Sequence, residues 1–187
     1  MKIPKHLTIR SVLLSYQLIL TILKKKANIN IIKTISSSSD FLSLVKLLDA
    51  ELKVYNGEDD SFYSQYNKIE NLRHVVVAYI DNIPVGCGTI KEYSPDTAEV
   101  KRMYVNNDAR GKGIGKKILV ELETWAKELG YKYVIMETGK FLRAAVALYS
   151  KSGYEVIPNY GPYAGIEKSI CFRKKINKNS FPSRSLS

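Results

Sequence analysis

Three apolar segments separated by two short turns constrain the fold most strongly. The segments are residues 74–80 (HVVVAYI), 85–93 (VGCGTIKEY) and 98–105 (AEVKRMYV), and they are rich in β-branched and aromatic residues. The turns at 81–84 and 94–97 contain Asp, Asn, Pro and Ser, which are typical turn residues. Turns this short join neighbouring strands as hairpins. The sequence therefore predicts an antiparallel meander of three strands.

Similar patterns predict the remaining helices and strands. Apolar residues at helical spacing indicate helices over residues 40–55, 113–129 and 141–152, and a weaker helix over 61–72. Ser39 or Asp40 is expected to cap the first helix. Apolar or β-branched runs indicate strands over residues 28–36, 131–138, 154–157 and 169–175. The order β-α-α-β-β-β-α-β-α-β-β predicts an α+β fold, in which helices flank a mixed, mostly antiparallel sheet.

The net charge of +11 lies mainly at the two ends of the chain. Residues 1–33 contain seven Lys or Arg and no acid, and residues 177–187 contain two more basic residues and no acid. The 20 basic and 18 acidic residues between 34 and 176 leave a net charge of only +2. A nucleic-acid partner is therefore not expected, because the folded part has no large basic excess.

The two ends of the chain are expected to lie outside the folded domain. Residues 7–23 are apolar and follow a basic start, but no small-residue cleavage site follows them, so a secretory signal is not expected. Arg10 and Gln17 interrupt this run, which argues against stable insertion into a membrane. We interpret residues 1–28 as an accessory or foreign extension, 29–176 as one domain and 177–187 as a disordered tail.

Cysteine and histidine are both scarce. Cys87 and Cys171 fit a reducing compartment better than a disulfide framework, so we expect a cytoplasmic protein. His6 and His74 stand far apart, and no grouping of His, Cys, Asp and Glu has metal-ligand spacing. We therefore expect no metal site.

A glycine-rich basic stretch, ARGKGIGKK (residues 109–117), separates the third meander strand from an amphipathic helix. Its glycines allow the backbone to approach a ligand closely and to adopt left-handed dihedral angles. A helix N-terminus presents unpaired N–H groups and positive dipole character, which favour an anion. Basic side chains add charge at the same place: Arg110, Lys112, Lys116 and Lys117. The stretch therefore predicts a binding site for a polyphosphate.

Spacing excludes two common nucleotide-binding motifs at this stretch. A Walker A loop would need Gly at position 110 and Ser or Thr at position 117, where the chain has Arg110 and Lys117. The dinucleotide fingerprint needs G-x-G-x-x-G, whereas Gly111, Gly113 and Gly115 form G-x-G-x-G. The polyphosphate must be bound by a motif of another kind.

The spacing Arg110-x-x-Gly113-x-Gly115 resembles the pyrophosphate-binding motif of the GNAT N-acetyltransferases, which use acetyl-CoA. A second segment, AAVALYSKSGYEVI (residues 144–157), resembles another conserved region of this superfamily. Its matching residues are Ala145, Leu148–Tyr149 and Gly153–Tyr154. The element order also matches from about residue 29 to 175, and the ending around PNYGPYAGIEKSICF resembles a subgroup of small bacterial GNAT proteins. The chain departs from the pattern at Leu142, where many members have an Asn that contacts the cofactor.

The resemblance implies a GNAT (acyl-CoA N-acyltransferase) fold and a set of residues that bind acetyl-CoA as the acetyl donor. In that fold the strand at 98–105 splays from its neighbour, so that its exposed main chain binds the pantetheine arm. The Tyr104 amide would then polarise the thioester carbonyl, and Tyr149 would lie near the sulfur as a hydrogen-bond donor or acid. The implied cofactor-binding residues are Met103, Tyr104, Val105, Arg110, Gly111, Lys112, Gly113, Ile114, Gly115, Lys116 and Tyr149.

Candidates for the base and for the acceptor site follow from the same resemblance. Glu99 lies on the strand that enters the site and is the leading candidate base, with Glu137 on the neighbouring strand second and an ordered water third. Glu99 could instead pair with Lys101 or Arg102 on the sheet surface. The loop at residues 158–165 would face the acceptor, and its Tyr160 and Tyr163 would line that pocket or else cover the end of the sheet.

Together these expectations describe an N-acetyltransferase that moves an acetyl group to a primary amine of a small molecule by direct attack on the thioester. The alternatives are a non-catalytic acyl-CoA-binding module of the same fold and a peptide or protein N-acetyltransferase. The sequence leaves the acceptor amine open, because variable loops build that pocket. It also leaves open the oligomeric state, with a homodimer as one option.

Overall fold

The computed structural model describes residues 28–69 and 72–176. The expected N-terminal extension (apart from Asn28) and the expected C-terminal tail lie outside this range. Among the described residues, no helix has the length and apolar character needed to cross a membrane.

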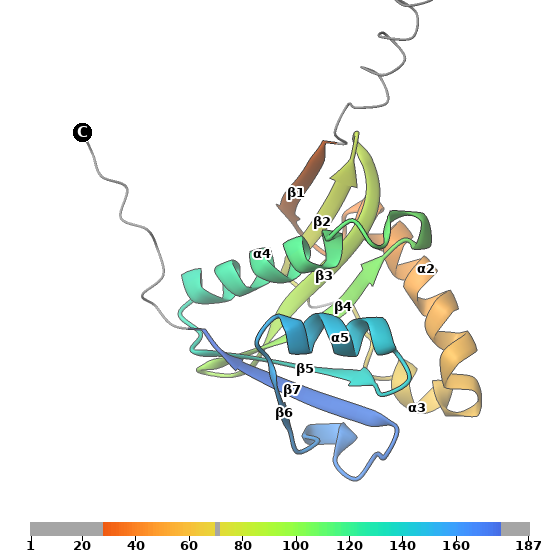
Figure 1. Cartoon of the computed structure of the whole chain (residues 1–187), viewed down its shortest axis with the longest axis vertical. Helices are drawn as coiled ribbons and strands as arrows, with labels where there is room; N and C mark the ends of the chain where they lie inside the picture. Colours follow the sequence, from red (N-terminus) through yellow and green to blue (C-terminus); the bar gives the residue numbers. More distant parts are fainter. Residues whose placement is uncertain (1–27, 70–71, 177–187) are drawn as a thin grey trace, which may run out of the picture.

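Within the described residues the chain forms one sheet of seven strands in the order β1-β2-β3-β4-β5-β7-β6 (Figure 1). The strands are β1 (Ile29–Thr34), β2 (His74–Ile80), β3 (Ile83–Ser94), β4 (Thr97–Val105), β5 (Tyr133–Gly139), β6 (Glu155–Ile157) and β7 (Ser169–Lys175). Neighbouring strands are antiparallel throughout, apart from the parallel pair β4–β5. The expected mixed, mostly antiparallel sheet is confirmed.

The predicted meander is formed by β2, β3 and β4. Asp81 and Asn82 connect β2 to β3, and both have positive φ angles, 48° and 68°. Two consecutive residues of this conformation form the hairpin turn whose twist matches that of the flanking strands. Asp and Asn are the non-glycine residues that adopt it most readily. The turn chemistry of the sequence thus determines the register of this hairpin.

Four helices flank the sheet in the described region: α2 (Ser39–Asn56), α3 (Asp60–Ser64), α4 (Ile114–Glu128) and α5 (Arg143–Lys151). Residues of β2 alternate between the two faces, so that Val75 and Val77 pack in the cluster with α2, while Val76 packs in the cluster with α4. Tyr149 brings α5 into the α4 cluster. The period of two in a strand therefore produces two apolar cores on opposite faces of one sheet.

The pairing of β4 with β5 stops after three residues. It joins Thr97, Ala98 and Glu99 to Tyr133, Val134 and Ile135 and continues no further. Beyond Glu99 the two strands diverge, and the main chain of β4 on that side has no neighbouring strand (Figure 1). The splay that the resemblance implied is present, and it positions the candidate site.

Three details differ from the sequence-based expectations. The weaker helix ends at Ser64 instead of Leu72, because turn hydrogen bonds from the N–H groups of Tyr66 and Asn67 close the chain on itself there. Ser38, rather than Ser39 or Asp40, precedes the first turn of α2. The helix expected over 113–129 begins at Ile114, after Gly113 in the left-handed conformation, and ends at Glu128.

Gly86 is required where β3, β4 and α4 come close together. A Cβ atom on Gly86 would lie 2.8 Å from the Tyr104 carbonyl oxygen and 3.0 Å from Ile118 Cδ1. Because one obstacle is backbone, Gly86→Ala should lower the free energy of unfolding by about 1–3 kcal/mol. Thermal denaturation measures this loss. Val120→Ala, on the half-exposed side of α4, is the control and should change stability by about 0.5 kcal/mol or less. Equal melting temperatures for the two variants would contradict the close approach.

Candidate active site

Three neighbouring cavities lie where β4 and β5 diverge. The first, the groove, has a volume of about 530 Å³ and runs from the start of α4 to Tyr149. The second, the central cavity, has a volume of about 140 Å³ and lies between Glu99 and Tyr149. The third, the tyrosine-walled cavity, has a volume of about 400 Å³. The groove and the central cavity share residues such as Met103 and Tyr149, so they are continuous at that point.

The start of α4 forms one end of the groove. Gly111 and Gly113 have φ angles of 77° and 75°, and a Cβ atom on either would have no neighbour within 4 Å. The first backbone hydrogen bond at this end runs from the Lys117 N–H to the Gly113 carbonyl. The N–H groups of residues 114–116 precede that bond and have no acceptor within the helix. The loop therefore offers several unpaired donors next to open space.

Arg110 is held beside this helix end by two elements. Its Nε atom donates to the Val105 carbonyl at 2.8 Å, and Nη2 donates to both Glu51 carboxylate oxygens at 2.9 and 2.8 Å. The guanidinium also lies over the Tyr104 ring, with 5.8 Å to the ring centroid. The charge predicted for the polyphosphate site is therefore present, but Glu51 on α2 partly neutralises it.

Most of the expected cofactor-binding residues line the groove. They are Met103, Tyr104, Val105, Arg110, Gly111, Gly113, Ile114, Gly115, Lys116 and Tyr149. Lys112 does not line it, and its Nζ atom donates to the Asp108 carbonyl at 3.0 Å. Leu142, the departure from the family pattern, lines both the groove and the central cavity.

A β-bulge distorts β4 at the point where the cavities meet. Cys87 pairs with Tyr104 and Thr89 pairs with Lys101, which leaves Gly88 opposite two residues of β4. One of them, Arg102, has a φ angle of 56°, a left-handed conformation that costs about 1–3 kcal/mol in a non-glycine residue. Such bulges occur next to active sites, where they redirect side chains and end strand pairing. Sequence reasoning missed this bulge, because the residue of β4 with the left-handed conformation is an arginine and not a glycine.

The Arg102 side chain is buried and points to α2. It forms an ion pair with Asp49, while Nε and Nη1 have no hydrogen-bond partner among the described residues. The sequence suggested Lys101 or Arg102 as a partner for Glu99. Arg102 pairs with Asp49 instead. The ion pair joins the bulge to α2, which supports the strained backbone from one side.

Tyr149 lies where the groove meets the central cavity. Its ring is buried against Phe172 and Tyr154, with centroid distances of 5.7 and 6.2 Å. Burial, and secondarily the charge of Glu137, raise the pKa of the Tyr149 hydroxyl. The hydroxyl therefore stays protonated at neutral pH and is available there as a hydrogen-bond donor.

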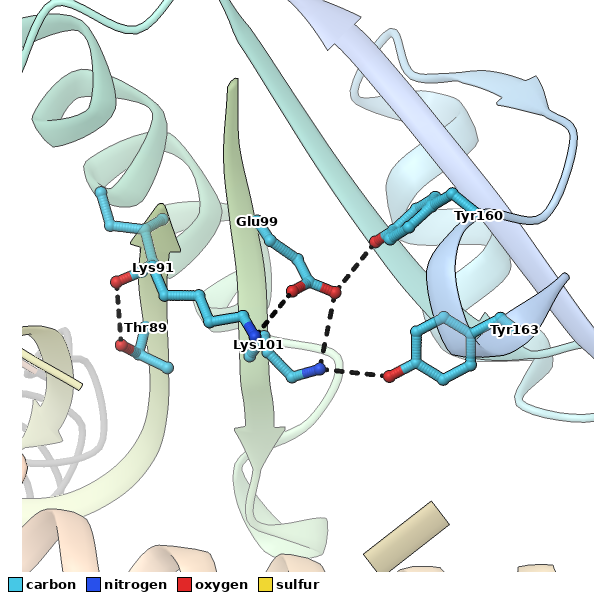
Figure 2. A network of polar contacts seen from close by, with 7 residues as sticks. Thr89, Lys91, Glu99, Lys101, Tyr160 and Tyr163 are labelled. Carbon is cyan, nitrogen blue, oxygen red and sulfur yellow. Dashed lines mark hydrogen bonds and ion pairs between the residues drawn. The ribbon is translucent and has the colours of Figure 1, made fainter. Parts of the chain in front are cut away.

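Glu99 is buried in a network of polar side chains (Figure 2). The Tyr160 hydroxyl donates to its Oε1 atom at 3.0 Å, and Lys101 Nζ lies 3.5 Å from the same oxygen. Lys91 Nζ lies 3.4 Å from Oε2. The expected pairing of Glu99 with Lys101 is thus present, and three donors already occupy the carboxylate.

Glu137 has a different environment on β5. Its Oε1 atom accepts a hydrogen bond from Ser169 Oγ at 2.6 Å, and Ser169 Oγ in turn lies 3.2 Å from the Tyr63 hydroxyl. Burial raises the pKa of the Glu137 carboxyl, although the Ser169 hydrogen bond and the charge of Lys101 act in the opposite direction. Desolvation disfavours a carboxylate, so this group accepts a proton more readily than an ordinary glutamate.

Lys101 and Tyr163 line the central cavity where it meets the tyrosine-walled cavity. Lys101 Nζ donates to the Tyr163 hydroxyl at 3.1 Å, and burial lowers the pKa of this lysine. The Tyr160 and Tyr163 rings pack edge to face, with centroids 5.9 Å apart. Tyr163 lines the central and the tyrosine-walled cavities, and Tyr160 lines the second of these. Sequence reasoning found the tyrosines from the Gly- and Pro-rich loop, but it did not propose Lys101 as a cavity residue.

Comparisons with known proteins agree with this geometry. Residues 41–154 match the family model described as "Acetyltransferase (GNAT) family". The chain is 31% identical over 151 residues to an IAA acetyltransferase of Azospirillum brasilense, a match that covers 76% of this chain and 97% of the relative.

Solved structures share the fold. A Klebsiella pneumoniae protein assigned as an acyl-CoA N-acyltransferase has a TM-score of 0.66 and 25% identity, and the match covers 80% of this chain and 98% of that one. A GNAT family acetyltransferase from Elizabethkingia anophelis, solved with acetyl-CoA bound, has a TM-score of 0.59 and 20% identity, covering 80% and 99%.

The raised pKa of Glu137 predicts how stability depends on pH. A carboxyl whose pKa is higher in the folded than in the unfolded state stabilises the fold fully below its unfolded pKa, and this contribution is lost as pH rises through the folded pKa. Glu137→Gln keeps an acceptor for Ser169 and removes the titration. Relative to the wild type, it should therefore gain stability as pH rises above the ordinary glutamate value of 4.5.

Denaturant unfolding between pH 4 and pH 8 measures this difference. Glu155→Gln, at an exposed position on β6, is the control for the loss of one carboxylate. A Glu137→Gln difference that changes with pH no more than that of the control, or that falls with rising pH, would contradict the raised pKa.

Proposed function

The chain belongs to the acetyltransferase (GNAT) family, and we propose that it transfers the acetyl group of acetyl-CoA to a primary amine of a small molecule. The observation that carries this proposal is the splay of β4 from β5, with a glycine-initiated helix at one end and buried Tyr149 and half-buried Glu137 at the other. A donor in the groove and an acceptor in the central cavity would meet at Tyr149.

The groove fits the donor in both shape and chemistry. The unpaired N–H groups at residues 114–116 and the Arg110 guanidinium would bind the pyrophosphate, because a helix N-terminus favours an anion. The open space above Gly111 and Gly113 leaves room for the phosphates. The free edge of β4 from Met103 to Val105 would hydrogen-bond the pantetheine amides in the way that a neighbouring strand would.

The Tyr104 main-chain N–H, the donor that the resemblance implied, faces β3, because Tyr104 pairs with Cys87 and the Asn106 N–H donates to the Val85 carbonyl. Our candidate for stabilising the thioester oxygen as negative charge develops on it is therefore a main-chain N–H on the open edge of β4 beside Tyr104. A fixed donor in a site that excludes water is effective, because it needs no reorganisation during the reaction. The bulge at Arg102, tied to Asp49, would hold this part of β4 in position.

Glu137 is the stronger candidate for the base, ahead of Glu99. The Glu99 carboxylate already has Lys91, Lys101 and the Tyr160 hydroxyl as partners. Glu137 is hydrogen-bonded to a neutral hydroxyl and has a raised pKa, which brings it closer to the range useful for a general base. This order is the reverse of the one expected from sequence.

The proposed reaction uses two side chains, one that accepts a proton and one that donates a proton. The amine nitrogen bonds to the carbonyl carbon and passes its proton to Glu137, directly or through one water. The carbon–sulfur bond breaks, and the Tyr149 hydroxyl gives its proton to the departing sulfur. Return of the proton from Glu137 to Tyr149 restores both side chains.

The size of the central cavity supports a small acceptor. Its volume is about 140 Å³, and Tyr163 and Lys101 line it where it meets the tyrosine-walled cavity. A folded protein surface could not enter such a space without movement of the tyrosine loop. We therefore favour a small-molecule amine over a protein acceptor.

Substitutions of Arg110 and of Glu51 should change the affinity for the donor in opposite directions. Arg110→Ala removes a phosphate partner and should weaken coenzyme A binding about tenfold, or about 1.4 kcal/mol. Glu51→Gln releases Arg110 and removes a negative charge near the phosphates, so it should tighten binding by a factor of about 2–5. Calorimetric titration with coenzyme A measures both.

Lys175→Ala, which removes a lysine of β7 that lines none of the three cavities, is the control for donor binding. The wild-type melting temperature should also rise with acetyl-CoA, because a ligand that binds only the folded state stabilises it. No rise at millimolar acetyl-CoA, or unchanged affinity in Arg110→Ala, would contradict the proposed donor site.

Tyr149→Phe should lower kcat about 100-fold and change KM little, because general-acid assistance acts in the transition state. Tyr154→Phe is the matched control. This variant removes a buried hydroxyl from a ring that packs on Tyr149. Tyr154 itself lines none of the three cavities. Steady-state release of free thiol measures both variants. Equal losses in the two would show that Tyr149 acts through packing alone.

A further inference from the structure

The tyrosine-walled cavity carries more positive than negative charge. Its lysines are Lys68, Lys91 and Lys101, and its one carboxylate is Glu99. The cavity is also aromatic, since Tyr66, Tyr93, Tyr160 and Tyr163 line it. Nothing in the donor site or in the proposed chemistry requires this combination.

Lys91 and Lys101 share a single carboxylate. Both ammonium groups lie within 3.5 Å of Glu99, and the Tyr160 hydroxyl is a third donor to it (Figure 2). An ammonium group has three donors, and Lys101 uses two of them, toward Glu99 and Tyr163. The Lys101 side chain is only 10% exposed, whereas that of Lys91 is 44% exposed and can move. Within the described part of the chain, the pair therefore has unused donors beside one directly paired carboxylate, and the other carboxylate that acts on Lys101, Glu137, is hydrogen-bonded to Ser169.

The position of Lys101 places its charge on the path of an acceptor. Lys101, Glu99 and Tyr163 line both the central cavity and the tyrosine-walled cavity. An acceptor whose amine lies near Tyr149 and whose other end extends into the tyrosine-walled cavity must pass Lys101. Arg102 adds no free charge at this point, because Asp49 neutralises it.

Resting on the proposed function, we infer that the acceptor is an amino acid with an apolar or aromatic side chain. Its carboxylate forms ion pairs with Lys101 and Lys91, and its side chain packs on the rings of Tyr93 and Tyr160, which lie 5.1 Å apart. A buried lysine left with an unused donor is stabilised by a carboxylate partner. Tyrosine rings offer broad apolar surfaces to such a side chain. A polyamine or an aminoglycoside would instead bring further positive charge against two lysines.

Matched pairs of acceptors test this inference with the full-length wild-type protein. L-phenylalanine, L-tyrosine and L-tryptophan are compared with phenethylamine, tyramine and tryptamine, which lack only the carboxylate. The amino acids should have kcat/KM values at least about tenfold higher, a difference of about 1.4 kcal/mol. Equal values, or faster acetylation of putrescine or spermidine, would overturn the inference.

Lys101→Met keeps the length of the side chain and removes its charge. It should raise KM for the amino acids at least about tenfold, the size expected for a lost buried ion pair, and leave KM for the decarboxylated amines unchanged. Its effect on kcat through Glu137, whose pKa the Lys101 charge lowers, should be the same for both classes of acceptor. Lys91→Met should have a smaller effect in the same direction, and it provides the test if Lys101→Met does not fold. Lys175→Met is the control. Equal changes in KM for the amino acids and for the decarboxylated amines in either lysine variant would overturn the inference.

A binding measurement separates failure of this inference from failure of the proposed function. N-acetyl-L-phenylalanine and N-acetylphenethylamine are titrated onto the coenzyme A-loaded protein by calorimetry. Tighter binding of the first, lost in Lys101→Met, supports the carboxylate site even if no amine is acetylated. Equal affinity contradicts the carboxylate site, whether or not transfer occurs. Absence of coenzyme A binding would contradict the proposed function itself.

Discussion

The short parallel pairing of β4 with β5 is the constraint on which the rest of the structure depends. Three residue pairs hold the two strands together at Thr97–Glu99, and the ladder ends there, just before the Arg102 bulge in the β3–β4 pairing. A sheet interrupted in this way exposes main-chain donors and acceptors along β4 and separates α4 from α5. The groove and the central cavity lie in that separation, so the proposed donor binding and chemistry would both depend on where a hydrogen-bond ladder ends.

The interior beside this opening contains more charge than an apolar core could accommodate without partners. Glu99, Arg102 and Lys101 are buried or nearly so, and each has an oppositely charged neighbour. Glu137 has a hydroxyl partner instead, and burial raises its pKa. Buried ionic networks contribute little net stability, because desolvation offsets the attraction. The charged side chains around this small cavity therefore fit a role in binding and proton transfer better than a role in stabilising the fold.

Local chemistry explains which parts could be predicted from sequence. The meander, the flanking helices and the position of the phosphate-binding end follow from apolar periodicity, from the Asp81–Asn82 turn and from the glycines before α4. The bulge could not be predicted, because Arg102 adopts a left-handed conformation that its residue type disfavours and tertiary contacts with Asp49 support. The helix expected to reach Leu72 ends at Ser64, because local turn bonds replace it. No feature of the sequence marks Lys101 as a cavity residue, since a lysine in a strand usually points to solvent. Glu137 ranks above Glu99 as the candidate base because of the partners of each carboxylate. Lys91 and Tyr160 contact Glu99 and Ser169 contacts Glu137, and these three residues lie on separate segments of the chain.

Amide hydrogen exchange with and without acetyl-CoA tests the central claim most directly, because it reports on the individual main-chain groups that the account assigns to the donor. The account predicts slower exchange at residues 103–105 on β4 and at residues 114–116 at the start of α4, with little change on β6. Acetyl-CoA that binds without protecting either segment, or that protects only residues remote from the splay, would contradict the account.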